Sequence, residues 1–302
     1  MFKATAAATA RRSVYPPLLS GETIFAIGDI HGRADLLDAL HLEIDAALAQ
    51  LGGPALEIYL GDYVDRGTRS AGVIERLVRR GRVRRTIMLR GNHEALFQQA
   101  LDGALELREW ARFGGLPTLE SYGVHGTHWQ NGGDWLARLR ARIPVEHAMF
   151  LQSLSDSVLR GEYFFVHAGV RPGVPLRAQA PDDLYWIRRD FLDDQRDHGA
   201  VIVHGHTPTQ EPELRHNRIN LDTGAFISGR LSCMRIDRDG ARLFGGDAGL
   251  SAPILAPVGG ESVRKFSLAA FDKGSLLARA RRAGSSFICG WRFRKPEPAK
   301  VV

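Results

Sequence analysis

The 302-residue sequence predicts an α/β fold, and three observations support this prediction. Short apolar runs rich in β-branched residues recur along the chain, as they do in buried strands. Apolar residues at helical spacing follow the early runs. Each run ends abruptly in a cluster of Gly, Asp, His or Asn, which is typical of strands that lead into turns. Strands that alternate with helices in this way indicate an α/β protein, a class that some schemes would call α+β.

The predicted elements follow one another along the chain. The strands are residues 23–27, 56–60, 86–89, 163–166, 201–203 and 219–221. One apolar helix face is predicted from Leu36, Leu37, Leu40, Ile44, Ala47 and Leu48, and another from Val73, Ile74, Leu77 and Val78. Residues 95–160 are predicted to be mostly helical, with a loop around residues 113–133, and we expect Trp110, Trp129 and Trp135 to lie in the core.

Composition narrows the class of protein. The chain is 44% hydrophobic and 25% charged, which is ordinary for a soluble globular protein. Its two cysteines, Cys233 and Cys289, lie far apart, so neither a disulfide scaffold nor a thiolate zinc site is expected. No apolar run reaches the ~18 residues that a membrane span needs. These features predict a cytoplasmic protein.

Positive charge is concentrated at the two ends of the chain. Residues 21–250 hold 27 basic and 31 acidic residues, whereas residues 251–302 hold ten basic and three acidic ones. A mildly acidic body does not support nucleic-acid binding. We expect an N-terminal tail over residues 1–20, a catalytic domain over 21–250 and a basic extension of unknown role over 251–302. That extension is either a solvated tail or a contact for an anionic partner.

Side chains suited to metal binding stand at the ends of the predicted strands. Asp29 and His31 are one residue apart after the first strand, and Asp62 follows the second. Further along the chain come Asn92, His167 and His206. Carboxylate and imidazole ligands without a thiolate suit Mn, Fe, Zn or Mg better than a structural zinc. In open α/β sheets ligands bind beyond the carboxyl ends of the strands, so we expect these groups to converge on one rim.

The residue types at this rim predict phosphoester hydrolysis. A carboxylate such as Asp62 can bridge two cations about 3.5–4 Å apart, which lower the pKa of a shared water toward about 7. The attacking hydroxide needs an acid on the opposite side of the phosphorus, and we predict that His93 is this acid, oriented by Asp65. Arg66 is predicted to bind the phosphate bidentately. Each motif alone is weak, but five clusters in a fixed order are hard to obtain by chance.

The same strings resemble the calcineurin-like metallophosphoesterases, and within them the bacterial members of the phosphoprotein phosphatase branch. Residues 28–32, 61–67, 91–94, 167–169 and 205–208 read GDIHG, GDYVDRG, GNHE, HAG and GHTP. Residues 110–115, 118–123 and 184–188 are also similar to strings in the bacterial members. The resemblance covers about residues 21–245. It implies a four-layer αββα sandwich, with two mixed sheets flanked by helices and metals at the C-terminal ends of the strands.

The resemblance also implies a role for each matching residue. Asp29, His31 and Asp62 match the ligands of a first metal, and Asp62, Asn92, His167 and His206 match those of a second. His93 matches the general acid, with Asp65 as its partner. Arg66, Asn92 and a second arginine match the groups that bind the substrate phosphate. Arg188 is the expected second arginine, and Arg171 competes with it. His204 matches no family ligand and is expected in the core or behind the ligands.

The implied enzyme carries two divalent metal ions, with Mn expected and Fe, Zn or Mg as alternatives. Its first expected function is a serine/threonine protein phosphatase, acting on a phosphoprotein or a phosphorylated small molecule. A dinucleoside polyphosphate hydrolase with the same metal site is the alternative. A catalytically inactive phosphate-binding module would be expected to lack a ligand or the acid, and none is missing from the sequence.

Overall fold

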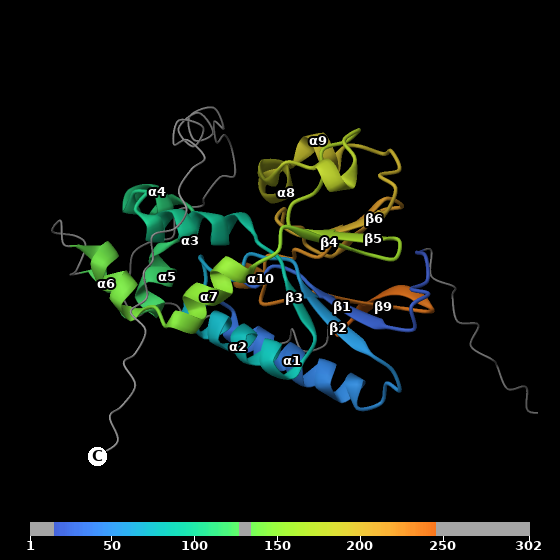
Figure 1. Cartoon of the computed structure of the whole chain (residues 1–302), viewed down its shortest axis with the longest axis horizontal. Helices are drawn as coiled ribbons and strands as arrows, with labels where there is room; N and C mark the ends of the chain where they lie inside the picture. Colours follow the sequence, from blue (N-terminus) through green and yellow to red (C-terminus); the bar gives the residue numbers. More distant parts are fainter. Residues whose placement is uncertain (1–14, 127–133, 246–302) are drawn as a thin grey trace, which may run out of the picture. The chain divides into compact units, whose positions relative to one another are not determined.

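The computed structural model describes residues 15–126 and 134–245, and this part of the chain forms two five-stranded sheets with helices on their outer faces (Figure 1). The first sheet has the order β10-β9-β1-β2-β3 and the second the order β4-β5-β6-β8-β7. The strands of the first sheet are β1 (Thr23–Ile27), β2 (Ala55–Tyr59), β3 (Thr86–Met88), β9 (Cys233–Asp237) and β10 (Gly240–Phe244). Those of the second are β4 (Ser157–Arg160), β5 (Tyr163–Val166), β6 (Val201–His204), β7 (Glu213–Leu214) and β8 (Arg218–Asn220).

Both sheets are mixed. Within each sheet, the parallel strands all point in the same direction. In the first sheet β1, β2 and β3 are parallel, while β9 pairs with β1 antiparallel. In the second sheet β5, β6 and β8 are parallel, and β4 and β7 are antiparallel edge strands. Parallel strands end at one edge, so the segments that follow them lie close together. The predicted fold class is confirmed.

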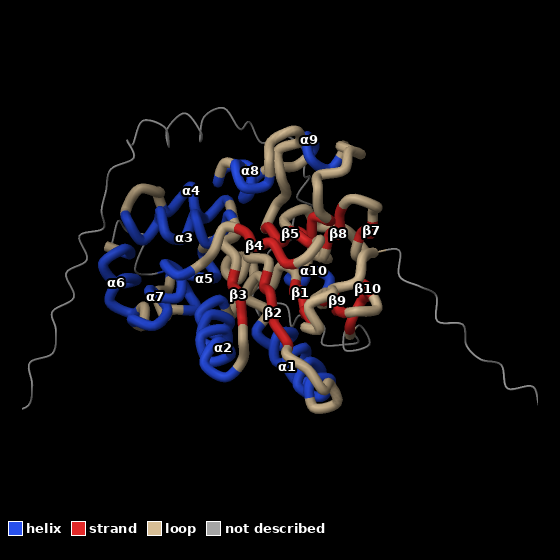
Figure 2. The backbone as a smooth tube through the Cα atoms, turned by 45° about the vertical axis from the view of Figure 1, so that its right-hand side comes forward, coloured by secondary structure: helices blue, strands red, loops and turns tan. Residues whose placement is uncertain are grey.

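The helices cover the outer faces and one side of the sandwich (Figure 2). They are α1 (Ala34–Leu48), α2 (Ser70–Val83), α3 (Asn92–Asp102), α4 (Leu107–Arg112), α5 (Leu116–Ser121), α6 (Trp135–Arg142), α7 (Val145–Ser153), α8 (Pro181–Trp186), α9 (Arg189–Leu192) and α10 (Ala225–Ser228). Helix α5 lies inside the segment predicted as a loop. Its six residues are too few to show a helical period, and Pro117 stands in its first turn, where the missing N–H costs nothing.

Side chains of the central strands point alternately to the two faces of the sheet, and this explains how the layers pack. Ile24 and Ala26 of β1 belong to the cluster between the two sheets, which includes Phe165 and Val203 of the second sheet. Phe25 and Ile27 of the same strand point the other way, because successive side chains of a strand face opposite sides.

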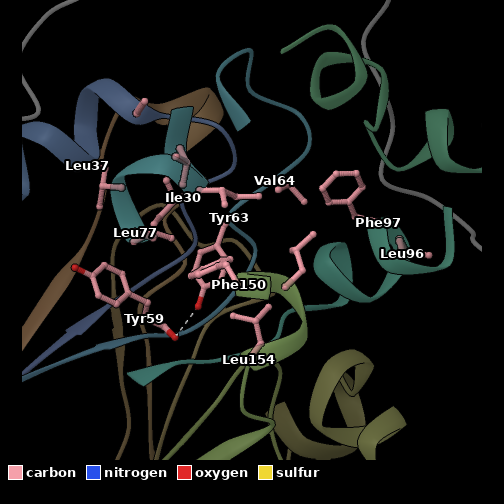
Figure 3. Close-up of a cluster of buried hydrophobic side chains, with 14 of the residues drawn as sticks. Ile30, Leu37, Tyr59, Tyr63, Val64, Leu77, Leu96, Phe97, Phe150 and Leu154 are labelled. Carbon is pink, nitrogen blue, oxygen red and sulfur yellow. Dashed lines mark hydrogen bonds between the residues drawn. The ribbon is translucent and has the colours of Figure 1, made fainter. Parts of the chain in front are cut away.

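The opposite face of the first sheet packs against helices. Figure 3 shows this cluster, in which Tyr59 and Tyr63 lie beside Leu77 of α2 and Phe150 of α7. The outer face of the second sheet is smaller, and there Phe164 and Ile202 pack against Leu184 and Phe191 of α8 and α9. Each sheet is therefore buried on both faces, which leaves the rim at the strand ends as the place for polar chemistry.

The predicted strands are all present, within one or two residues at their ends, whereas β4, β7, β9 and β10 were not predicted. These strands are short or carry polar residues between apolar ones, such as Arg235 in β9. Trp110 is fully buried and Trp135 packs against the same cluster, as expected, while Trp129 lies outside the described residues. Cys233 is buried as a free thiol.

The predicted ends of the chain are described only in part. Tyr15 and Leu18, from the segment expected as a tail, are buried in the cluster between the sheets. The backbone N–H of Leu18 donates to Asp237 O at 2.9 Å, so residues 15–18 are part of the folded body. Residues 1–14 and 246–302, with the basic extension, lie outside the described residues. In the described ranges no helix is long and apolar enough to cross a membrane.

Candidate metal centre

The loops after β1, β2 and β6 hold their polar residues in an unusual backbone conformation. The described residues other than glycine with positive φ are His31, Asp62, Asp65, Arg66 and His206, with φ between 43° and 69°. This left-handed region costs a residue with a Cβ about 1–3 kcal/mol, and such residues cluster at functional sites. All five are residues that the sequence predicts to be ligands or catalytic groups.

Asp62 is shared by two buried groups of metal-binding side chains. His31, Asp62 and His93 form one group, and Asp62, His167 and His206 form the other; within each group the ligand atoms lie within 4.8 Å of one another. The side chains of both groups are at most 4% exposed. Of the predicted ligands, Asp29 is not in either group, although it is equally buried.

The group around His167 consists of hydrogen-bond acceptors that face one another. His167 Nδ1 lies 2.9 Å from Leu60 O and must donate to it, so the neutral ring has no proton on Nε2. That bare Nε2 lies 3.0 Å from Asn92 Oδ1 and 3.3 Å from Asp62 Oδ1. Three acceptors without a donor between them repel unless a cation lies among them. One imidazole nitrogen and two oxygens arranged in this way are suitable ligands for a divalent cation.

The group around His31 also brings ring nitrogens and a carboxylate together, but here a donor, Arg66, lies among them. His31 Nδ1 donates to Val64 O at 2.8 Å, which leaves Nε2 bare and 3.4 Å from Asp62 Oδ2. Arg66 Nη1 donates to this Nε2 at 3.0 Å. Asp29 accepts the backbone N–H of His206 through Oδ2 at 3.0 Å, while its buried Oδ1 has no hydrogen-bond partner within residues 15–126 and 134–245. An unsatisfied carboxylate oxygen in the protein interior is costly, so this atom also fits a cation ligand.

Burial sets the protonation of these ligands. It raises the pKa of Asp62 to about 7, against a lowering contribution from Arg66. Burial, followed by the charges of Asp222 and Asp62, raises the pKa of Asp29 well above its ordinary value. Burial also lowers the pKa of His167 to about 4, so this imidazole is neutral and able to bind a metal near neutral pH.

His93 is held between a carboxylate and a guanidinium. Its Nδ1 donates to Asp65 Oδ2 at 2.8 Å, and its Nε2 accepts from Arg66 Nη2 at 3.0 Å. Asp65 also accepts from Trp110 Nε1 at 3.1 Å and from Thr118 Oγ1 at 2.7 Å. Burial raises the pKa of Asp65 to about 7, and the pKa of His93 is lowered well below its ordinary value by burial and by Arg66. The arrangement fixes the ring, and its Nε2, which carries no proton in the neutral ring, faces the group of His31 and Asp62.

The two candidate arginines for the second phosphate position differ in their surroundings. Arg188 is half-buried, and its Nη1 donates to Thr207 Oγ1 at 3.3 Å, next to His206. Burial and the charge of Arg66 lower the pKa of Arg188. The carboxylates Asp62, Asp222 and Asp29 raise it, so the charge of Arg188 interacts with the buried carboxylates of the centre. Arg171 is exposed and forms ion pairs with Asp183 and Asp190. The geometry therefore favours Arg188 over Arg171.

Glycines let the backbone come close to the ligands. A Cβ on Gly91 would collide with Asp62 Oδ1, and a Cβ on Gly205 would collide with Asp29 Oδ1. A larger residue at either position would displace a predicted ligand. His204, expected behind the ligands, is buried in β6 and its ring contacts Phe191 at 5.1 Å between centroids.

Several residues of the centre were not assigned a role from the sequence. Glu94 accepts the backbone N–H groups of Asp62, Tyr63, Val64 and Gly91 at 2.7–3.2 Å. It stands in the GNHE string, so its place in the first turn of α3 was a usable signal. Asp222 follows a predicted strand in the same way as the ligands do. Trp110 and Thr118 lie in strings that resemble the family, but their hydrogen bonds to Asp65 were not predicted, and neither was the contact of Phe226 with His31, because these contacts join distant parts of the fold.

Comparison with known proteins identifies the family. The family model of calcineurin-like phosphoesterases matches residues 22–229. The chain is 30% identical to serine/threonine-protein phosphatase 1 of Salmonella typhimurium over 70% of its own length and 91% of the relative. It is 26% identical to the asymmetrical bis(5'-nucleosyl)-tetraphosphatase PrpE of Anoxybacillus flavithermus over 59% of its length and 74% of the relative.

Solved structures agree at the level of the fold. The crystal structure of a candidate diadenosine tetraphosphatase matches 76% of this chain and 96% of its own, with a TM-score of 0.51 and 21% identity. The buried His and Asp groups are consistent with a dimetal site. Because the family model spans more than half of the chain and the donor sets fit divalent cations, the chain belongs to the calcineurin-like phosphoesterases and is a metal-dependent phosphoesterase.

Proposed function

We propose that this phosphoesterase hydrolyses dinucleoside tetraphosphates, by adding water across one phosphoanhydride bond so that two nucleotides leave. The proposal rests on one observation: an arginine and an aromatic ring lie beside each of the two clusters. Arg66 lies over the ring of Phe226 at 5.0 Å beside His31, and Arg188 lies next to Thr207, where the Trp186 ring contacts His206. A substrate with a base at each end and phosphates between them matches an aromatic ring and an arginine on either side of a metal centre.

The charges of the site support a polyphosphate substrate. Arg66 and Arg188 are half-buried, and guanidinium groups bind phosphate bidentately and more strongly where water is excluded. Half-buried aromatic rings such as Phe226 and Trp186 stack on bases without reading their sequence. The similarity to two PrpE relatives, over 59% and 69% of the chain, favours the same substrate class.

In this proposal each residue of the site has its own role. The bound cations would be held by Asp29, His31, Asp62, Asn92, His167 and His206, and would activate water and neutralise phosphoryl charge. Arg66 and Arg188 hold neighbouring phosphates. Asp65 holds the Nδ1 proton of His93 in the neutral ring, whose Nε2 carries no proton and accepts from Arg66. To act as the acid, His93 takes up a second proton from solvent on Nε2, and this proton then passes to the leaving oxygen while Asp65 stabilises the imidazolium.

A serine/threonine protein phosphatase is the second candidate. The phosphatase from Salmonella typhimurium is the relative with 30% identity, and it aligns over 91% of its own length. The same clusters and the same acid would serve a phosphoserine ester, whose alkoxide leaving group depends more strongly on His93 than a nucleotide does.

A substrate comparison with Mn-loaded protein tests the proposal. We expect kcat/KM to be highest for a dinucleoside tetraphosphate, lower for phenyl phosphate and lowest for a phosphoserine peptide. Phe226→Ala and Trp186→Ala are each expected to lower kcat/KM for the dinucleotide about tenfold, because stacking contributes about 1–3 kcal/mol per base, and to leave phenyl phosphate nearly unchanged. Preference for the phosphopeptide, with no effect of either variant on the dinucleotide, would establish the second candidate instead.

A further inference from the structure

Asp222 lies at the rim, at the point where the ends of β1 and β8 meet across the sandwich. A Cβ on Gly28 would lie 2.9 Å from the carbonyl carbon of Leu221 and 3.2 Å from its Cβ, so the two backbones touch there. The next residue on each strand is an aspartate, Asp29 on one side and Asp222 on the other. The close approach therefore brings two carboxylates to the same part of the centre.

The Asp222 side chain is rigidly held but incompletely satisfied. It is 1% exposed, and its Oδ1 accepts the backbone N–H of Gly224 at 2.8 Å. The backbone N–H of Asp222 donates to Asn220 Oδ1 at 3.0 Å, and its carbonyl accepts from the N–H of Thr209 at 3.0 Å. Its Oδ2 is buried and has no hydrogen-bond partner among the residues that the structure describes, and the same holds for Oδ1 of Asp29. Two such orphaned carboxylate oxygens need a cation or another donor to be tolerated in the interior.

The segment after Asp222 borders the His31 cluster. Arg33 Nη1, from the loop after β1, donates to Ala225 O at 2.9 Å. The Phe226 ring meets the ring of His31 at 5.3 Å between centroids. Residues 222–226 therefore pack against the loop of residues 29–33, which holds the predicted ligands Asp29 and His31.

Electrostatics agree with this placement. After burial, the charge of Asp222 is the largest contribution that raises the pKa of Asp29, ahead of Asp62. Asp222 also raises the pKa of Asp62. Three buried carboxylates thus repel one another when they are ionised. Burial raises the pKa of Asp222, while the Gly224 N–H and the charges of the half-buried Arg66 and Arg188 lower it. A divalent cation between the carboxylates would remove this repulsion.

We propose that Asp222 supplies a further carboxylate oxygen, its free Oδ2, to the cation site formed by Asp29, His31 and Asp62. Cations such as Mn²⁺ and Mg²⁺ favour six ligands, mostly oxygens, so three side chains leave room for another carboxylate. The inference rests on the dimetal site of the proposed function and is independent of the substrate. Asp222 then acts on cation affinity, and it is not assigned a proton-transfer step.

Calorimetric titration of the metal-stripped full chain with MnCl₂ tests this role. We expect two binding events for the wild-type protein. In Asp222→Asn, whose amide oxygen still accepts the Gly224 N–H, one event is expected to weaken by about 10–100-fold while the other is unchanged. Asp237→Asn is the matched control, because Asp237 is also a buried aspartate but pairs with Arg242 at the far side of the sheet. Its two Mn²⁺ affinities should equal those of the wild type.

Thermal unfolding separates a ligand from a merely structural residue. In chelator, Asp222→Asn is expected to raise the melting temperature, because one of three mutually repelling carboxylates is gone. With saturating MnCl₂ the same variant is expected to melt below the wild type. Asp222→Ser, which retains an acceptor for Gly224, serves if the Asn variant does not fold. Unchanged Mn²⁺ affinities in a folded variant, or an equal loss of melting temperature in chelator and in MnCl₂, would overturn the role of Asp222. Fewer than two Mn²⁺ ions on the wild type would instead refute the dimetal site itself.

Discussion

The two sheets contribute to the metal centre in different ways. The first-sheet side, residues 29–66 and 92–94, is braced by its own contacts: Glu94 accepts four backbone N–H groups, three of them from residues 62–64. The second-sheet side, which comprises His167, Arg188, His206 and Asp222, depends on the other sheet. His167 donates to Leu60 O, His206 Nδ1 contacts Asn92 Oδ1, and the His206 N–H donates to Asp29.

This difference indicates an order of dependence. The first-sheet side is built from segments that are close in sequence, and it carries four of the five left-handed residues described at the rim. The second-sheet side has its imidazoles oriented only when the two sheets are packed together. A change in Asp62, or in Glu94 that braces its loop, should therefore disturb both clusters, whereas a change in His167 or His206 should disturb only the cluster to which they belong.

Asp62→Asn gives the largest expected effect, because Asp62 belongs to both clusters. We expect loss of both Mn²⁺ ions and a fall in kcat on phenyl phosphate of at least about 10³-fold, since the cations stabilise the transition state by several kcal/mol. Metal analysis and initial rates on the same sample measure this, with Asp102→Asn on the surface as the control. Retention of two ions at full rate would contradict the shared-ligand assignment.

His93→Asn tests the acid within the first-sheet side. We expect kcat on phenyl phosphate to fall by about 10²-fold or more, with a smaller loss on 4-nitrophenyl phosphate, whose leaving group needs less protonation. Metal content should stay at the wild-type level. Asp65→Asn should show the same pattern more weakly. Equal losses on both esters would mean that His93 acts in some other way.

Glu94→Gln tests the brace that distinguishes the first-sheet side. An amide at this position presents N–H groups to backbone N–H donors, so we expect a loss of unfolding free energy of about 2–3 kcal/mol. Both Mn²⁺ affinities should weaken together, because the Asp62 backbone is no longer fixed. Denaturant titration and calorimetry measure the two effects. Glu146→Gln, in the exposed first turn of α7, is the control, with an expected change within about 0.5 kcal/mol.

Arg188→Ala probes the second-sheet side. We expect kcat/KM for a dinucleoside tetraphosphate to fall by about tenfold or more, mainly through KM, because a charge-assisted hydrogen bond contributes about 1.5–3 kcal/mol. Arg171→Ala removes exposed ion pairs, which contribute about 0–1 kcal/mol, and should leave kcat/KM unchanged. Steady-state kinetics of the pair decide which arginine binds phosphate, and the reverse result would favour Arg171.

Proton release on metal binding gives the smallest expected effect. Burial raises the pKa of Asp62 to about 7, so this group in the metal-free protein is mostly protonated at pH 6 and mostly ionised at pH 8. Binding of Mn²⁺ ionises it, and proton release should therefore be larger at pH 6 than at pH 8. His167, with its pKa lowered to about 4, is neutral at both pH values and releases none. Calorimetry in buffers of different ionisation enthalpy measures the difference.

Much of this molecule could be predicted from its sequence, for reasons that are local. The strands β1 and β5 begin and end where their apolar runs do, because alternation and turn residues act within a few positions. Asp29, His31, Asp62 and Asn92 could be singled out since each follows a strand directly. The strands β9 and β10 were not predicted, because neither is a continuous apolar run; β9 pairs with β1, over two hundred residues away, and β10 pairs with β9.

The sequence by itself determined the fold class, the family and the residue types at the rim. Hydrophobic periodicity and the motifs that follow the strands each depend only on residues that are neighbours in the chain. The tertiary structure decided how these residues meet: that Asp62 is common to two clusters, that Glu94 braces the loop behind it, and that Gly28, before Asp29, touches Leu221, before Asp222. Such contacts join segments up to 193 residues apart, and their distances depend on how the two sheets pack, which no local pattern encodes.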